Sequence, residues 1–269
     1  MSTSRVLVLG AIAGMTILLG LPVGRLRNPA PRFRAMLNAI AIGILVFLLF
    51  DVLAHANEPV ETALTDAGDG IASWWRFAGL AAVFAVGFAV GLIGLVYFDR
   101  YMNAPSSDRV GTRPLANWSP GRRLALMIAA GIGLHNFSEG LVIGQSAANG
   151  EISLALLLIV GFGLHNATEG FGIIAPLAAE TDRPSWGFLG AMGLLGGGPT
   201  FVGTLVGKSF VNDTLFLACL ALAAGSILYV VIQLLKVASR QPSELIMWGI
   251  FAGIVAGFAS DYVLVAAGV

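Results

Sequence analysis

Two short segments of the chain repeat the same polar residues at the same spacing. GIGLHNFSEG begins at Gly131, and GFGLHNATEG begins thirty residues later, at Gly161. Within each copy, His and Glu are four residues apart and Asn and Glu are three apart, so on a helix the three side chains share one face. An imidazole and a carboxylate placed in this way can transfer a proton, form an ion pair or bind a divalent metal ion.

The chain around these residues contains few charges. Of its 269 residues, 57% are hydrophobic and 11% are charged, whereas a soluble domain carries about 25% charged residues. The composition predicts a polytopic membrane protein in contact with the lipid bilayer, without a large soluble domain. A net charge of zero and the lack of a long basic run do not support nucleic-acid binding. The single cysteine, Cys219, cannot form an intramolecular disulfide.

Eight apolar runs have about the twenty residues that a helix needs to span a bilayer. The first run follows Arg5, as in a signal peptide, but no cleavage site of small residues follows it, so we expect a retained helix. The fold class predicted is all-α integral membrane, with one transmembrane domain. We expect helices near 4–24, 33–56, 72–98, 122–147, 152–179, 185–207, 213–237 and 243–267.

Lys and Arg predict the orientation, because cytoplasmic loops hold them in excess. With eight alternating helices, all the basic residues except Arg5, Arg76 and Lys208 fall on one side. We expect that side to be cytoplasmic, the protein to lie in the cytoplasmic (inner) membrane, and both termini to lie outside. The outward segment between the second and third helices is expected to be a solvated loop or an acidic funnel for cations. Its acidic residues are Glu58, Glu61, Asp66 and Asp69.

The two motif histidines are expected at the same depth. His135 and His165 each lie about thirteen residues into their helix, which is roughly 20 Å from the starting surface at 1.5 Å per residue. A tight turn around Asn149 and Gly150 makes the two helices antiparallel, so the motifs should meet near mid-membrane. The motif glycines are expected to pack these two helices against each other; they are Gly131, Gly133, Gly140, Gly161, Gly163 and Gly170.

Opposed in this way, the motifs form one polar cluster. Burying a carboxylate in hydrocarbon costs several kcal/mol, and two facing carboxylates repel unless a positive charge lies between them. A divalent cation meets that need, with Zn²⁺ expected first and Fe²⁺, Mn²⁺, Co²⁺ or Cd²⁺ as alternatives. A single intramembrane His is more often a packed residue than a ligand, but the second copy favours metal binding. The predicted site consists of His135, Asn136, Glu139, His165, Asn166 and Glu169.

Two other functions fit part of this pattern. An intramembrane metalloenzyme needs a general base beside the metal and commonly carries H-E-x-x-H on one helix. That spacing is absent and both Glu residues are expected as ligands, so we do not expect an enzyme. In a bis-His haem protein, His135 and His165 would be the axial ligands, but two carboxylates beside a haem have no evident purpose.

The motif pair resembles the signature of the ZIP family of divalent metal transporters, a HNxPEG-type sequence on the fourth and fifth helices. GILVFLLFDVLAH, from Gly43 to His55, is similar to the family's second helix, and LAAGSILYVVIQLL, from Leu222 to Leu235, to its seventh. The resemblance implies metal transport into the cytoplasm. It also implies a 3+2+3 inverted pseudo-repeat around helices 4 and 5, often in a homodimer. The primary metal site would comprise His135, Glu139, His165 and Glu169, with Asn136 and Asn166 where binuclear members bind a second metal.

The chain departs from the family pattern at several positions. Ser138 and Thr168 replace the motif proline, which should soften the helix break. Asn166 replaces a residue that is acidic in some members, and Gly198 rather than an acid precedes Pro199. With fewer negative charges, we expect one bound metal rather than two. Gln233 and Lys236 stand where Glu and Pro are expected, which predicts a less typical release route; carrier or channel-like transport and proton coupling are left open.

A few polar residues outside the motif are candidates for the transport pathway. Asp51 and His55 are four residues apart near the outer end of the second helix, where they would line an entrance or lie at the interface. Gln145 and Ser146, one to two turns beyond Glu139, would mark the outer path.

Overall fold

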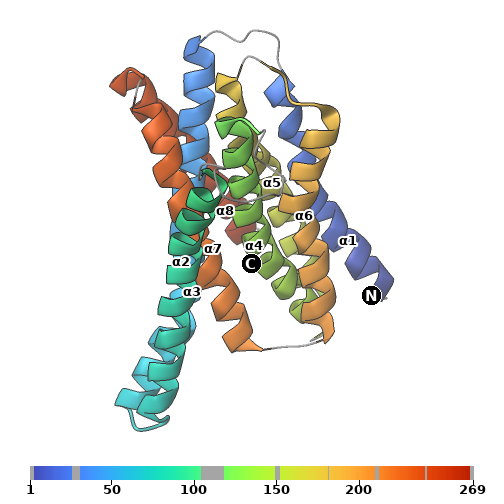
Figure 1. Cartoon of the computed structure of the whole chain (residues 1–269). Helices are drawn as coiled ribbons and strands as arrows, with labels where there is room; N and C mark the ends of the chain where they lie inside the picture. Colours follow the sequence, from blue (N-terminus) through green and yellow to red (C-terminus); the bar gives the residue numbers. More distant parts are fainter. Residues whose placement is uncertain are drawn as a thin grey trace, which may run out of the picture.

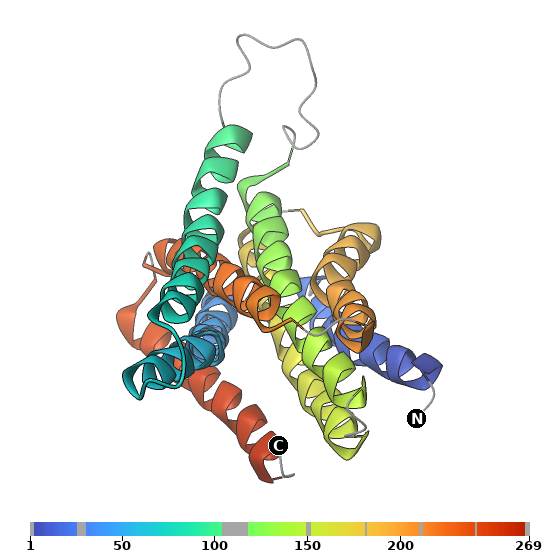
Figure 2. The same ribbon diagram turned by 90° about the horizontal axis from the view of Figure 1, so that it is seen from below.

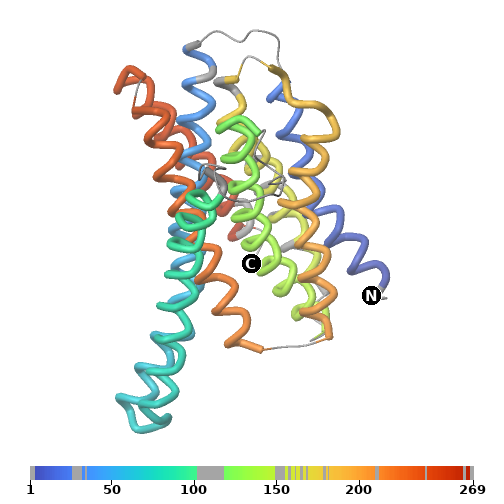
Figure 3. Tube along the Cα trace, viewed as in Figure 1, coloured from blue at the N-terminus to red at the C-terminus, as the bar shows by residue number. Residues whose placement is uncertain are grey.

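The protein is described as a computed structural model over residues 3–25, 31–103, 118–148, 152–180, 182–209, 212–239 and 241–266. Within these ranges all regular secondary structure is helical (Figure 1). The chain reverses direction from each long helix to the next (Figure 3). The long helices are α1 (Thr3–Met15), α2 (Pro31–Gly68), α3 (Trp74–Asn103), α4 (Pro120–Ala148), α5 (Ile152–Ile174), α6 (Trp186–Ser209), α7 (Asp213–Ala238) and α8 (Ser243–Ala266).

Short 3-10 segments extend two of these helices. Segments η1 (Thr16–Leu19) and η2 (Leu21–Arg25) continue α1, and η3 (Ala175–Ala179) continues α5. Pro176 lies at the start of η3, where its ring and its missing N–H disfavour continuation of the α-helix. In the described part of the chain, seven helical segments are long and apolar enough to cross a membrane. Helix α5, with 23 residues, is the other long helix.

Two of the expected helices end too early: α3 continues to Asn103 instead of ending near residue 98, and the larger difference is at the end of the second helix. Instead of ending near residue 56, α2 continues for 38 residues to Gly68. The prediction of a loop at Glu58, Glu61 and Asp66 is therefore wrong. At 1.5 Å per residue α2 is about 57 Å long, well beyond the roughly 30 Å of hydrocarbon in a bilayer. Together with the start of α3 it projects from one end of the bundle (Figure 1).

The end of α2 shows why the helix stops at that position. Gly70 has a φ of 73°, which is the left-handed conformation that closes many helices. The N–H of Ile71 bonds to the carbonyl of Asp66 at 2.8 Å, and the N–H of Gly70 bonds to that of Ala67 at 3.3 Å. These two bonds form a Schellman motif, so a glycine rather than the loss of apolar residues ends the helix.

Glycines allow the helices to cross at close range. A Cβ on Gly140 of α4 would lie 2.2 Å from the Thr200 carbonyl oxygen of α6, and one on Gly203 of α6 would lie 2.0 Å from that of Phe137. Glycine pairs of the same kind join α2 to α8 and α3 to α7. The backbones touch at these crossings, as is usual where small residues replace the hydrophobic drive that is absent in lipid.

The motif glycines pack against different partners from those expected. A Cβ added to Gly133 or Gly140 would lie closest to atoms of α6, and one added to Gly131 would lie closest to atoms of α7. A Cβ added to Gly163 or Gly170 would lie closest to atoms of α1 and η1. The prediction that these glycines pack α4 against α5 is wrong for the five whose surroundings are described. They instead pack α4 against α6 and α7, and α5 against α1 and η1. In the view along the bundle, α1 and α6 lie on one side of α4 and α5, and α2, α3 and α8 lie on the other (Figure 2).

Basic residues hold one end of the bundle together. The Arg25 guanidinium donates to the carbonyl of Pro184 at 2.7 Å and lies over the ring of Trp186. Arg122, at the start of α4, lies 3.9 Å from the Glu180 carboxylate. The segments after α1, before α4 and after α5 therefore meet at the same end, as the alternation of eight helices requires. This end is called the basic end below.

Candidate metal centre

Helix α4 carries the first motif on an unbroken helix. Ser138 stands where a proline would interrupt it, and its hydroxyl donates to the carbonyl of Leu134 at 3.4 Å. His135, Asn136 and Glu139 are all buried, with exposed fractions of 4%, 0% and 5%. The softer break expected from the missing proline is thus no break at all in α4.

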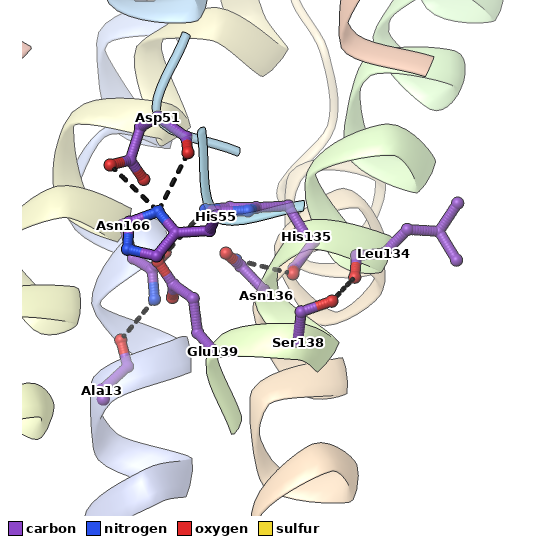
Figure 4. A network of polar contacts seen from close by, with 10 residues as sticks. Ala13, Asp51, His55, Leu134, His135, Asn136, Ser138, Glu139 and Asn166 are labelled. Carbon is purple, nitrogen blue, oxygen red and sulfur yellow. Dashed lines mark hydrogen bonds and ion pairs between the residues drawn. The ribbon is translucent and has the colours of Figure 1, made fainter. Parts of the chain in front are cut away.

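His135 and Glu139 are in direct contact (Figure 4). The imidazole Nε2 lies 3.2 Å from Oε1 of the carboxylate, one helical turn away on the same face. An imidazole and a carboxylate at this distance can form an ion pair or a hydrogen bond. A metal ion would replace the proton between them, because it needs a neutral imidazole and an ionised carboxylate as ligands.

Helix α5 carries the second motif with its Asn and Glu fully buried. Asn166 and Glu169 each have an exposed fraction of 0%. The side chain of His165 lies outside the described residues. Among the side chains that the structure describes, no three of the His, Cys, Asp and Glu type are grouped as metal ligands. The structure therefore brings His135 and Glu139 together and buries Glu169.

The two motif asparagines have equivalent hydrogen bonds to neighbouring helices. Nδ2 of Asn136 donates to the carbonyl of Gly196 in α6 at 3.0 Å, and Nδ2 of Asn166 donates to that of Ala13 in α1 at 3.2 Å. Oδ1 of each side chain is buried and accepts no hydrogen bond from the residues that the structure describes. An unsatisfied buried oxygen costs about 1–3 kcal/mol, so each asparagine presents an acceptor that a cation would satisfy.

The carbonyl of Ala13 lies next to a change of helix type. Helix α1 changes from α to 3-10 after Met15, and the Thr16 hydroxyl is 2.6 Å from the carbonyl oxygens of both Ala13 and Gly163. In α6, Gly196 lies three residues before Pro199, whose missing N–H leaves the carbonyl of Leu195 rather than that of Gly196 without its helical donor. The asparagine side chains thus tie each motif helix to its neighbour, at Gly196 of α6 and at Ala13 of α1.

The pathway candidates on α2, Asp51 and His55, contact each other (Figure 4). Nδ1 of His55 lies 3.5 Å from the carboxylate Oδ1 of Asp51 and 2.9 Å from the backbone carbonyl oxygen of the same residue. Their side chains are 59% and 31% exposed. Of the outer-path candidates on α4, Ser146 is buried and Gln145 is half-buried.

One residue beside the motif helices was not anticipated from the sequence. Thr200 of α6 is fully buried, and its hydroxyl has no hydrogen-bond partner in the described part of the chain. A Cβ on Gly14 of α1 would lie 2.7 Å from this hydroxyl, and one on Gly140 of α4 would lie 2.2 Å from the carbonyl of the same residue. The available signal was the position of Thr200 directly after Pro199, in the helix that the motif glycines contact.

Comparison with known proteins does not identify a relative. No protein-family model matches the chain, and the search of curated proteins gives no match.

Proposed function

We propose that the protein carries a divalent transition-metal ion, with Zn²⁺ as the first candidate, across the membrane through the site on α4 and α5. The observation that carries the proposal is the burial of Glu139 and Glu169, 5% and 0% exposed, in two helices of an apolar bundle. An ionised side chain in the middle of a membrane span costs about 3 kcal/mol even on the lower scales. Such residues persist where they serve ion or proton movement.

The ligand chemistry supports a metal rather than a proton alone. His135 and Glu139 supply a nitrogen and an oxygen 3.2 Å apart, and the Oδ1 atoms of Asn136 and Asn166 supply buried acceptors. Nitrogen and oxygen ligands without thiolates suit Zn²⁺ and other first-row ions. With two carboxylates in the proposed set, one divalent ion neutralises the site, which favours a single bound metal.

The neighbour relations of the helices support the inverted 3+2+3 repeat. Exchanging α1 with α6, α2 with α7, α3 with α8 and α4 with α5 maps the main contacts onto one another. The contact of α3 with α7 then corresponds to that of α2 with α8, and the contact of α4 with α6 to that of α5 with α1. The two asparagine hydrogen bonds also exchange under this operation. Inverted repeats around a central site are a common basis of alternating access.

Metal uptake into proteoliposomes tests the proposal. We expect Zn²⁺ uptake by the full chain that is lost in Glu139→Gln and Glu169→Gln, because glutamine keeps the shape of the side chain and removes the charge. Glu244→Gln, at an exposed position in the first turn of α8, is the matched control and should transport normally. Equal uptake by all four proteins would exclude this site from transport.

A further inference from the structure

A polar cavity lies at the basic end, between α3, α4 and α7. Its volume is about 320 Å³, which is at the lower end of the range for small-molecule sites. Arg123 and Lys236 bring two positive charges to its wall and Asp99 brings one negative charge. Pro120 and Met127 contribute apolar surface.

A chain of hydrogen bonds crosses the wall of this cavity. Nζ of Lys236 donates to Oε1 of Gln233 at 3.3 Å, and Nε2 of Gln233 donates to the Tyr229 hydroxyl at 2.6 Å. That hydroxyl is in turn hydrogen-bonded with the Asp99 carboxylate. The hydrogen bond of Lys236 thus goes to a neutral amide. Because Arg123 and Lys236 outnumber Asp99, the cavity lining carries a net positive charge.

The position of the cavity adds to its preference for anions. Helix α4 begins at Pro120 on the cavity wall, and the N-terminus of a helix carries a partial positive charge. Lys236 lies in the last turn of α7, and Asp99 lies near the end of the membrane-spanning part of α3. The cavity therefore lies at the depth of the lipid headgroups, where basic pockets between helices bind anionic lipids.

We propose that this cavity binds a phosphate group, supplied by the headgroup of an anionic phospholipid or by free phosphate. The site is separate from His135 and Glu139 and does not depend on metal transport. Asp99 distinguishes an anion from a cation as the ligand. Its carboxylate repels a bound anion, whereas a bound cation would need it.

Native mass spectrometry of the purified, delipidated full chain tests the proposal. Dioleoyl phosphatidylglycerol and dioleoyl phosphatidylcholine are titrated separately without added metal, and inorganic phosphate is then added as a competitor. We expect phosphatidylglycerol to bind more tightly than phosphatidylcholine. Lys236→Gln should weaken phosphatidylglycerol about fivefold, the effect of one basic residue near a membrane surface. Lys208→Gln, in the last turn of α6, is the control and should bind like the wild type. Asp99→Asn should bind more tightly.

The competitor identifies the source of the phosphate. Displacement of phosphatidylglycerol by millimolar phosphate assigns the site to free phosphate, and its retention assigns the site to the lipid. Equal binding of the two lipids, or equal effects of Lys236→Gln and Lys208→Gln, would overturn the proposal. Weaker phosphatidylglycerol binding by Asp99→Asn would also overturn the proposal, because removal of a repelling carboxylate cannot weaken the binding of an anion. Because no metal is added in the lipid titrations, failure of metal uptake leaves these outcomes unchanged.

Discussion

The amide nitrogen and the amide oxygen of Asn136 and of Asn166 have different roles. The amide nitrogen holds a carbonyl of the adjacent helix at 3.0 or 3.2 Å, which fixes the direction of the amide oxygen. That oxygen is buried without a hydrogen bond from the described residues. An aspartate at the same position would keep an oxygen ligand but could not hold the carbonyl, so substitution can separate the two roles.

Asn136→Asp should destabilise the metal-free protein by on the order of 1 kcal/mol, because the side-chain hydrogen bond to the carbonyl of Gly196 is lost. A carboxylate is a stronger metal ligand than an amide, so the rise in unfolding temperature on adding Zn²⁺ should exceed that of the wild type. Thermal unfolding with and without Zn²⁺ measures both effects.

Asn212→Asp is the control for this substitution. Asn212 caps α7 by accepting from the N–H of Leu215 at 2.8 Å, and aspartate caps a helix equally well. Its unfolding temperature and its response to Zn²⁺ should match the wild type. An unchanged metal-free unfolding temperature in Asn136→Asp would show that the hydrogen bond to Gly196 contributes nothing.

The helix crossings decide packing at the level of elements. Gly140→Ala puts a methyl group 2.2 Å from the Thr200 carbonyl, so α4 and α6 must separate, at a cost of about 1–3 kcal/mol. Gly94→Ala is the matched control, because no atom lies within 4 Å of its Cβ. It should be neutral or stabilise α3 by up to about 1 kcal/mol. Equal unfolding temperatures for the two variants would contradict the close crossing.

The α2–α3 turn allows a second comparison. Gly70→Ala forces an L-residue into a φ of 73°, which costs about 1–2 kcal/mol, and should increase hydrogen exchange at the amides of Ile71 and Ala72. Gly68→Ala, at the end of α2 with open space around its Cβ, should leave their exchange unchanged. If both variants exchange alike, the left-handed residue does not close the helix.

The length of apolar runs predicted the elements well, and local chemistry explains the two failures. Residues 57–68 contain Glu, Asp and Thr, so counting apolar residues ended α2 too early, although Gly70 marked its end. The motif glycines predicted close contacts, but periodicity does not specify which helix supplies the partner. The structure buries His135, Glu139 and Glu169, and their grouping around a metal ion stays a prediction. The hydrogen bonds of the asparagines to Gly196 and Ala13 depend on which helices pack against α4 and α5, and the motif does not reveal this.

The whole molecule has one end rich in basic residues and one acidic projection. In the apolar stretches of α3 and α8 that are long enough to cross a membrane, only 6% and 22% of the residues are buried in the protein. This is expected for helices that contact lipid. The positive-inside rule then predicts a cytoplasmic basic end and an external α2–α3 projection.

Labelling with a membrane-impermeant maleimide tests this orientation in intact cells that produce the Cys219→Ala protein. Ser73→Cys, in the exposed turn after α2, should be labelled from outside. Gln241→Cys, in the exposed turn before α8, should react only after the cells are opened. The opposite pattern would contradict the predicted orientation.

The most direct test of the account is Zn²⁺ uptake by the wild type, Glu169→Gln and Glu244→Gln in proteoliposomes containing equal amounts of folded protein. Glu169 is the fully buried carboxylate and Glu244 the exposed one. The account predicts uptake by the wild type and Glu244→Gln and at least a tenfold lower rate for Glu169→Gln, from the loss of one charged ligand worth more than about 1.4 kcal/mol. Uptake by Glu169→Gln at the wild-type rate would contradict a metal pathway through α4 and α5.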